Sequence, residues 1–384
     1  MKKLLLSPLF IVIAVMFTMI ALLAPSMTDK PDYEQTPPPS AQIDLKPVEA
    51  EGQALFWQYL GEGRVLCELC PHLCVIPDTM RGLCEVRENR GGKLYSLVYG
   101  RPVAVSMGPI EKAPFHHFFP GHSRRTIATA GCNLMCLNCQ NWTISQGSVD
   151  EIRYIPMTPE QIIQDVLNDG LTSVSFTYTE PTVFYEYMYD IARLAKQRGL
   201  KTNLVTNGFI NPDPLRQLLK YMDAVRVDLK AFTEDFYVNI TSGKLEPVLE
   251  TLKIIHEEGV HLEIINLVIP TLNDDPDDIR RMCEWIIENL SADVPIHFNR
   301  FFPQFKMTDL PATPVETLEK AASIARETGL RFVYIGNVAG HPLNNTFCPD
   351  CGEMVIKRSA LMVLSNKVVE GKCGYCGYAL PGEW

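Results

Sequence analysis

Short apolar segments alternate with amphipathic segments between residues 126 and 337 of the chain. The apolar segments have the composition of buried parallel strands, and they cover residues 126–130, 171–178, 201–206, 224–229, 262–268, 296–299 and 332–335. The intervening segments repeat apolar residues at helical spacing, as in residues 183–195. Thr158-Pro159 and Thr313-Pro314 mark two helix starts, because each places a capping residue before a proline. Six or seven successive βα units predict an α/β fold that forms a parallel barrel or an open partial barrel.

Polar residues follow most of the predicted strands at the point where each strand ends. Because functional side chains of parallel barrels gather at the carboxyl ends of the strands, we expect a site there. Loops are polar in general, so the repetition carries this prediction more than any single residue does. The residues concerned are Thr179, Glu180, Thr206, Asn207, Asp228, Lys230, Asn273, Arg300 and Asn337.

Composition places the chain among ordinary globular proteins, with 46% hydrophobic and 21% charged residues in 384. A net charge of −10 without a basic cluster indicates that the chain does not bind nucleic acid. The 12 cysteines are too few for a disulfide scaffold, which has more than about 8–10% cysteine. They occur in three clusters, within 67–84, 132–139 and 348–376, which favours metal ligation. Cys283 stands apart in a helical segment, and we expect it in the core.

The central cluster, Cys132-x3-Cys136-x2-Cys139, directly follows the first predicted barrel strand. Three thiolates on a tight loop can bind three irons of a cubane cluster. The fourth iron then has no protein ligand, as in catalytic metal sites that keep one position open.

The two other clusters each contain four cysteines. Cys67, Cys70, Cys74 and Cys84 have the spacing x2, x3, x9, which suits a closed four-ligand site for zinc or for a second iron–sulfur cluster. Cys348-x2-Cys351 and Cys373-x2-Cys376 each have a glycine after the second cysteine. This pattern is typical of a zinc ribbon, and a rubredoxin-like iron site is the alternative.

The spacing of the central triplet is the signature of the radical S-adenosylmethionine (radical SAM) superfamily. Nine segments in order, over roughly residues 60–360, resemble the AmmeMemoRadiSam-system radical SAM enzymes, which are relatives of the pyruvate formate-lyase activating enzymes. The resemblance implies a partial barrel of the (β/α)6 type. Five of the segments are ATAGCNLMCLNCQNWTISQ, FTYTEPTVFYEY, LVTNGF, VDLKAF and VYIGNVAGH.

The resemblance also implies cofactors and their ligands. Cys132, Cys136 and Cys139 would hold a [4Fe–4S] cluster, and S-adenosylmethionine would chelate its open iron. Thr179-Glu180-Pro181 corresponds to the family's Gly-Gly-Glu-Pro segment, so Glu180 is expected to bind the cofactor's ammonium group. Asn207 and Asp228 match further family positions in the cofactor site. Val205 replaces a family aspartate, which argues against a monovalent cation site here.

The implied reaction is reductive cleavage of S-adenosylmethionine to a 5′-deoxyadenosyl radical, which abstracts hydrogen from an unidentified substrate. A low-potential electron donor would be a partner. One alternative is a glycyl-radical-enzyme activase that acts on a partner protein. An alternative of another class is a membrane-tethered iron–sulfur or zinc protein for electron transfer or docking, which would not turn over the cofactor. A barrel lined by Phe176, Tyr178, Phe301 and Phe302 would exclude water.

Residues 4–24 carry no charge and are long enough to span a bilayer as a helix. They are either a single-pass membrane anchor or a signal peptide, and we expect an anchor. Lys2 and Lys3 before this segment would place the body outside the cytoplasm. Free thiolates and cofactor supply favour a cytoplasmic body instead, which is our expectation.

The chain is therefore predicted to have five parts. These are an anchor or signal segment (1–25), a proline-rich acidic linker (26–60), an N-terminal cysteine-rich module (61–120), the barrel (121–345) and a zinc-ribbon-like or rubredoxin-like tail (346–384).

Overall fold

The computed structural model describes residues 52–384. The predicted anchor, and the linker as far as residue 51, lie outside the described residues. Within 52–384, no helix combines the length and the apolar composition that crossing a bilayer requires.

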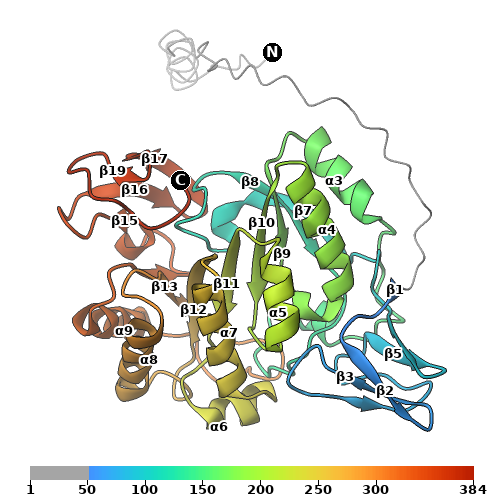
Figure 1. Ribbon diagram of the computed structural model, residues 1–384. Helices are drawn as coiled ribbons and strands as arrows, with labels where there is room; N and C mark the ends of the chain where they lie inside the picture. The colour runs from blue at the N-terminus through green and yellow to red at the C-terminus, as the bar shows by residue number, and fades with distance from the viewer. Residues whose placement is uncertain (1–51) are drawn as a thin grey trace, which may run out of the picture. The chain divides into compact units, whose positions relative to one another are not determined.

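An eight-stranded sheet forms the centre of this part of the chain, in the order β14-β13-β12-β11-β10-β9-β8-β7 (Figure 1). Every neighbouring pair from β8 to β14 is parallel, whereas β7 runs antiparallel to β8 at one edge. All seven predicted strands are confirmed within a few residues. The strands are β7 (Ala104–Pro109), β8 (Ser123–Ala128), β9 (Ser173–Phe176), β10 (Lys201–Thr206), β11 (Ala224–Asp228), β12 (His261–Val268), β13 (Ile296–Arg300) and β14 (Val333–Gly336).

Helices connect the parallel strands, as the alternating pattern predicts. They are α2 (Trp142–Ser145), α3 (Pro159–Asn168), α4 (Tyr185–Gln197), α5 (Pro212–Leu219), α6 (Glu234–Phe236), α7 (Leu245–Glu257), α8 (Pro276–Asn289) and α9 (Val315–Thr328). Short helical turns are η1 (Ile110–Lys112), η2 (Pro181–Phe184), the π-helical η3 (Tyr237–Thr241) and η4 (Pro342–Asn344).

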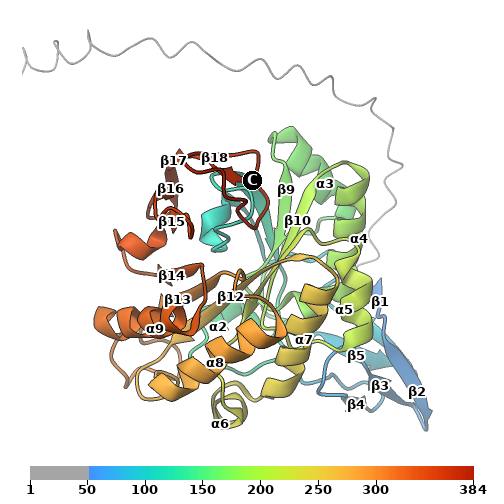
Figure 2. The ribbon, with the colours of Figure 1, turned by 60° about the vertical axis from the view of Figure 1, so that its left-hand side comes forward.

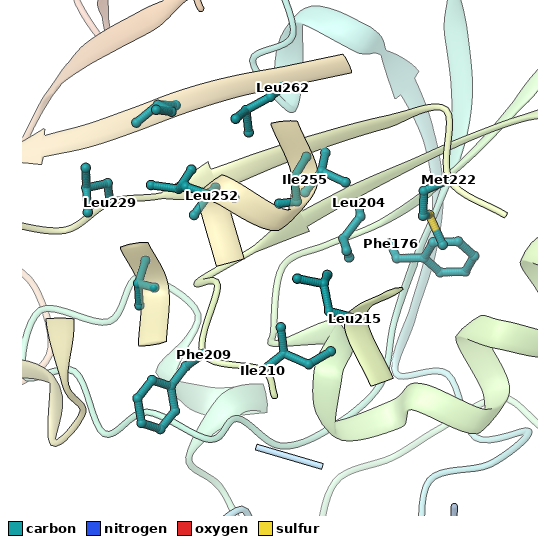
Figure 3. Packing of buried hydrophobic residues seen from close by; sticks show 14 of the residues in the cluster. Phe176, Leu204, Phe209, Ile210, Leu215, Met222, Leu229, Leu252, Ile255 and Leu262 are labelled. Carbon is teal, nitrogen blue, oxygen red and sulfur yellow. The ribbon is translucent and has the colours of Figure 1, made fainter. Parts of the chain in front are cut away.

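The main core lies between the sheet and these helices. Figure 3 shows Leu204 of β10 near Leu215 of α5 and Ile255 of α7, and all three side chains are buried. Cys283 on α8 is fully buried in this core, as expected. Burial of such side chains contributes roughly 25 cal/mol per Å² of apolar surface, which supplies most of the folding free energy.

Both predicted helix starts are confirmed within one residue, but only Thr158 caps its helix as predicted. Thr158 forms a capping box, in which its hydroxyl accepts from the Gln161 N–H (3.1 Å) and the Gln161 side chain accepts from the Thr158 N–H (2.7 Å). At the second start, Pro314 occupies the cap position. The hydroxyl of Thr313 instead accepts from the Phe301 N–H (3.0 Å) and donates to the Val268 carbonyl (2.6 Å), so it joins two strand ends.

Two small modules flank the central sheet, and they lie at opposite ends of it in both views (Figures 1 and 2). The N-terminal module has two three-stranded sheets, β1-β6-β5 and β2-β3-β4. Its strands are β1 (Gly52–Gln53), β2 (Trp57–Gly61), β3 (Arg64–Cys67), β4 (Val75–Ile76), β5 (Arg87–Arg90) and β6 (Lys93–Ser96). A buried ion pair between Arg87 and Glu186 of α4 (3.0 Å) attaches this module to the main core.

The C-terminal module consists of a three-stranded sheet, β15-β16-β17, and the pair β18-β19. Arg358 donates to the His116 carbonyl (2.8 Å), and Glu383 exchanges backbone hydrogen bonds with His117 and Phe119. These contacts hold the module against the segment between β7 and β8. The strands are β15 (Thr346–Phe347), β16 (Met354–Ser359), β17 (Met362–Asn366), β18 (Val368–Val369) and β19 (Lys372–Cys373). The five-part division of the chain stays a prediction.

Candidate active site

A cavity of about 700 Å³ opens at the carboxyl ends of the parallel strands. It brings together all seven residues that the sequence analysis assigned to the cluster and the cofactor: Cys132, Cys136, Cys139, Thr179, Glu180, Asn207 and Asp228. Thr206, Lys230 and Asn337 line it as well.

Two of the polar strand-end residues do not line this cavity and instead support the backbone. The Asn273 amide donates to the Lys230 carbonyl (2.6 Å), and its oxygen accepts from the Ile269 N–H (2.6 Å). Arg300 donates from Nε to the Thr313 carbonyl (2.8 Å). Both side chains therefore fix the loops that follow β12 and β13.

The loop that carries the three cysteines is held by backbone contacts. Gly131 has a φ of 98°, and a Cβ atom there would lie 2.7 Å from Cγ1 of Val86, so only glycine fits. The N–H groups of Met135 and Leu137 donate to the carbonyls of Thr241 and Ile240 on η3 (2.8 and 3.0 Å). The loop is thus fixed by the N-terminal module on one side and by η3 on the other.

The environment of the three thiols fits a metal cluster. Burial raises the pKa of Cys132 well above its usual value, and it raises the pKa of Cys136 to about 11 although Lys230 acts in the opposite direction. Thiols of this kind become thiolates only when a metal displaces the proton. All three cysteines line the cavity, so their side chains face one space. In a cubane, each of three thiolates binds a different iron.

Glu180 is buried at the cavity wall and its carboxylate is held in one orientation. Oε1 accepts from the Thr206 hydroxyl (2.7 Å) and from the Thr182 N–H (3.0 Å), while Oε2 accepts from the Asn207 N–H (2.7 Å). Burial raises the pKa of Glu180, although these donors oppose the shift. Oε1 already accepts two bonds, but Oε2 accepts only one and can accept a further bond from an ammonium donor in the cavity.

Asp228 at the end of β11 forms ion pairs with two cations. Arg226 lies 2.6 Å and Lys230 lies 3.3 Å from its carboxylate oxygens. Burial opposes ionisation of Asp228, but Arg226 and Lys230 outweigh it and hold its pKa below the usual value. Asp228 is therefore ionised at neutral pH.

The cavity lining includes charged residues that the sequence analysis missed, among them Arg124. Arg124 on β8 is 1% exposed, and Nη1 donates to the Thr126 hydroxyl. No carboxylate of residues 52–384 forms an ion pair with it, and burial lowers its pKa to about 10. An arginine inside a buried strand is unusual, so its place in SRRTIA was the available sequence signal.

Several cavity-lining side chains carry a buried polar atom without a hydrogen-bond partner in the described part of the chain. Such atoms are few in folded proteins, and each one points to a missing partner. They are Oε2 of Glu111, Nδ1 of His116, Nε of Arg124, Nε of Arg226 and Oδ1 of Asn299.

The expected aromatic lining is only partly correct. Tyr178 lines the cavity. Phe176 and Phe301 are buried in separate apolar clusters away from the lining. Phe302 is 50% exposed and packs against the Arg300 guanidinium (5.1 Å), because the chain leaves the sheet after β13.

His116 and His117 are both buried, and His116 lines the cavity. The backbone N–H groups of His116 and His117 donate to the Glu263 carboxylate (2.9–3.0 Å), and Nε2 of the His297 ring contacts the same carboxylate (2.7 Å). Burial lowers the pKa of His117 to about 3, so its ring is neutral.

The C-terminal cysteines form a compact ligand set. The Sγ atoms of Cys348 and Cys376 are 3.6 Å apart, and those of Cys351 and Cys373 are 3.7 Å apart. All four thiols lie within 4.8 Å of one another. One zinc ion with four thiolates at about 2.3 Å holds them roughly 3.8 Å apart, so this set fits zinc.

Comparison with known proteins identifies the family. The model of the radical SAM superfamily matches residues 126–286. The chain is 42% identical over 327 residues to the uncharacterized protein MJ0808 of Methanocaldococcus jannaschii, which covers 85% of this chain and 97% of that protein. It is 25% identical over 242 residues to a pyruvate formate-lyase-activating enzyme of Clostridium pasteurianum, covering 58% of this chain and 98% of the enzyme.

Among solved structures, a domain of the pyruvate-formate lyase-activating enzyme from Bacteroides vulgatus is 18% identical, with a TM-score of 0.37, and covers 43% of this chain and 98% of that domain. From the family match and the two relatives, we conclude that the chain belongs to the radical SAM superfamily and is related to the pyruvate formate-lyase-activating enzymes.

Proposed function

We propose that this radical SAM enzyme abstracts hydrogen from a small substrate whose anionic group is bound by Arg124. Its class uses a [4Fe–4S] cluster and S-adenosylmethionine, which together supply a one-electron reduction and a hydrogen-abstracting radical. The protein's own residues bind both cofactors, orient the substrate and keep water away.

In this proposal, the wall formed by the cysteine loop and by the ends of β9 and β10 holds the cofactors. Cys132, Cys136 and Cys139 bind the cluster, because all three line this cavity and together supply three thiolates. Glu180 accepts a hydrogen bond from the cofactor's ammonium group. Asn207 supports this contact, since its backbone fixes the Glu180 carboxylate and its amide contacts Cys132 Sγ (3.9 Å).

Thr179 and Asp228 have supporting roles at the same wall. The Thr179 hydroxyl donates to the Thr129 carbonyl (2.8 Å), which joins the Glu180 segment to the end of β8. Ionised Asp228 balances the charge of Lys230 beside the triplet. Neither contact requires a ligand, so both residues are ready before the cofactor binds.

The observation that carries the substrate proposal is the buried and unpaired charge of Arg124. Burying a cation without a partner costs several kcal/mol, so such a site is retained where a ligand supplies the opposite charge. Arg226 is close enough to lower the pKa of Arg124, and Lys112 lines the same cavity. A carboxylate or phosphate group would satisfy these cations and the orphaned Nε donors of both arginines.

Anaerobic incubation with reductant, S-adenosylmethionine and pairs of small molecules tests this proposal. Each pair contains an acid and its neutral amide or alcohol, and 5′-deoxyadenosine is measured. We expect acids alone to stimulate product formation, with KM raised at least tenfold in Arg124→Gln. Substrate-independent cofactor cleavage should be unchanged in that variant. Equal stimulation by acids and neutral analogues would refute the proposal.

A second candidate function is activation of a glycyl radical enzyme. It is favoured by the Clostridium pasteurianum enzyme, of which this chain covers 98%. In that case the substrate is a backbone glycine of a partner protein. A glycyl radical detected by electron paramagnetic resonance (EPR) after incubation with the partner, and no turnover of small acids, would favour activation.

The remaining assignments concern location and the C-terminal metal. We propose that residues 1–25 anchor the enzyme by a single span, with the body in the cytoplasm, where thiols stay reduced and a low-potential donor is available. A C-terminal phosphatase fusion tests the side, because phosphatase activity requires export. We also propose that Cys348, Cys351, Cys373 and Cys376 bind zinc, which metal analysis of the purified chain will measure.

A further inference from the structure

The main cavity extends beyond the proposed cofactor residues toward the amino ends of the strands. Side chains two positions apart on a strand share one face of the sheet, so Arg226 precedes Asp228 on the inner face of β11. In the same way, His297 precedes Asn299 on β13. These four residues all line the cavity, as Arg124 of β8 does. A two-residue step is about 6.6 Å along a strand, so the cavity contains a second polar layer beside the cofactor site.

Glu263 of β12 holds the His297 ring from behind the cavity wall. It is fully buried and is not part of the cavity lining, whereas His297 is. Its Oε2 lies 2.7 Å from Nε2 of His297, and its Oε1 lies 3.1 Å from Nε2 of His261. Burial opposes ionisation of Glu263, but the hydrogen bonds from His261 and His297 outweigh it and hold its pKa well below the usual value. Because an ionised carboxylate only accepts hydrogen bonds, Nε2 of His297 carries the hydrogen.

The hydrogen on Nε2 makes Nδ1 of His297 a hydrogen-bond acceptor. Burial lowers the pKa of His297, although Glu263 opposes this shift, so the ring is neutral at pH 7. A neutral imidazole that is protonated at Nε2 has a lone pair at Nδ1. Within residues 52–384, the His297 side chain makes its only hydrogen bond to Glu263, so no donor occupies Nδ1. A ligand in the cavity can supply the missing donor.

The ring of His116 adjoins His297 and has a second unpaired nitrogen. The centroids of the two rings are 4.7 Å apart, and the Tyr334 ring packs against both, at 4.4 Å from His116 and 4.9 Å from His297. His116 is 4% exposed, and its Nδ1 is buried without a hydrogen-bond partner in the described part of the chain. Burial lowers the pKa of His116 well below its usual value. Two neutral imidazoles in fixed orientations therefore offer unpaired nitrogens at one part of the cavity wall.

A hydroxyl group is the chemistry that suits both nitrogens. Nδ1 of His297 requires a donor, and Nδ1 of His116 is a donor or an acceptor according to the tautomer of that ring. A hydroxyl donates one hydrogen bond and accepts two, so it pairs with either tautomer. A carboxylate has no hydrogen to donate. An ammonium group would add a positive charge to a lining that already contains Arg124, Arg226 and Lys112.

Arg226 connects the imidazole pair to the site proposed for the anion. In the strand order of the sheet, β11 lies between β8, which carries Arg124, and β13, which carries His297. Arg226 is the register partner of Glu263 on the neighbouring strand, and it is close enough to Arg124 to lower the pKa of that residue. The hydroxyl and the anionic group can therefore belong to one small molecule.

We propose that the substrate is a hydroxylated organic anion, whose hydroxyl group donates to Nδ1 of His297 beside the His116 ring while its anionic group pairs with Arg124. This inference rests on the proposed function and narrows its substrate class to hydroxy carboxylates and hydroxyalkyl phosphates. Glu263 is a positioning residue, because it acts on the substrate only through the orientation and tautomer of His297.

The test measures probe binding to the full chain, prepared without oxygen so that it retains its cluster, with S-adenosylmethionine present and no reductant. The probes are ω-hydroxy carboxylates of two to six carbons and glycerol phosphate, and ligand-detected nuclear magnetic resonance gives each Kd. Every hydroxy carboxylate is compared with the acid that lacks the hydroxyl, with the amino acid and with the neutral hydroxyamide; glycerol phosphate is compared with propyl phosphate.

We expect at least one hydroxylated anion to bind roughly 3- to 10-fold more tightly than its counterparts without the hydroxyl. The carboxylate and phosphate arms show which anionic group the site takes. Equal binding of the paired compounds throughout the series, or no binding by any hydroxylated anion, would overturn the proposal. The comparison with hydroxyamides depends on Arg124 alone, so the hydroxyl preference and the charge preference are measured separately.

Two matched variants assign the preference to His297. His297→Gln keeps an amide donor for Glu263 and loses Nδ1, so we expect the hydroxylated anion and its counterpart to bind within twofold of each other. His261→Gln is the control, because His261 contacts the same carboxylate but is not part of the cavity lining, and it should keep the preference. A full preference in a folded His297→Gln chain would contradict the assignment. Arg124→Gln should weaken binding of every acid and leave the hydroxyl preference unchanged.

Discussion

Replacing Glu180 with glutamine tests the cofactor site, because the change keeps the shape of the side chain and removes its charge. The glutamine oxygen is expected on the side of the Thr206 hydroxyl and the Thr182 N–H, where it keeps two bonds. The amide NH2 then faces the Asn207 N–H, and that bond is lost. Loss of a hydrogen bond to a charged group costs about 1.5–3 kcal/mol, which is the expected loss of folding stability.

The same substitution removes the charged acceptor proposed for the cofactor's ammonium group. A loss of about 1.5–3 kcal/mol in binding free energy corresponds to a rise of roughly 10- to 150-fold in the Kd for S-adenosylmethionine. Equilibrium dialysis under anaerobic conditions measures this Kd, and urea unfolding measures stability. Thr206→Val is the matched control, because it removes one donor to Glu180 and leaves the carboxylate. A Kd in Glu180→Gln within twofold of the wild-type value would refute the assignment.

Three further predictions concern the loop, the buried histidines and the C-terminal metal. Gly131→Ala should destabilise the chain by ~1–3 kcal/mol and lower the iron content measured by elemental analysis, because the new Cβ meets Val86. Gly170→Ala is the control and should retain the full iron content, because Gly170 also has a positive φ but has open space around it. The pKa of His117 falls to about 3 in the folded chain, so below pH 6.5 the unfolded chain binds more protons than the folded chain does. The free energy of unfolding should therefore drop by ~2 kcal/mol between pH 6.5 and 5. In His117→Gln, urea unfolding at several pH values should show a smaller drop. Cys351→Ser should release the C-terminal zinc and lower Tm, and an unchanged metal content would contradict zinc at this site.

The seven parallel strands were predictable because most positions on both faces of each strand are buried, which leaves short, mostly apolar segments. β7 was missed because the edge strand Ala104–Pro109 is only half-buried and shows neither an apolar run nor clear alternation. The predicted cluster and cofactor residues do line one cavity, since parallel strands bring their carboxyl ends to one edge.

Two kinds of detail could not be predicted from the sequence. Thr313 precedes a proline, yet its hydroxyl joins β12 to the residue after β13, because a tertiary partner competes with the local cap. The significance of Arg124 depends on the lack of a direct ion pair with any carboxylate of residues 52–384, and pairing across a sheet is not encoded in local periodicity. The spacing of Cys67, Cys70, Cys74 and Cys84 in the sequence permits both zinc and a cluster, because the same four-thiolate set can bind either.

The C-terminal module has a consequence for ligand binding. Asn344, Ala360 and Leu361 contribute to the wall of the main cavity, and Arg358 of the same module holds the His116 backbone there. In the proposed function, zinc bound by the tail therefore helps to shape the wall of the substrate cavity. The two binding affinities are then linked. If the metal raises the affinity of the cavity for a molecule that contacts this wall, that molecule raises the affinity of the tail for the metal by the same factor.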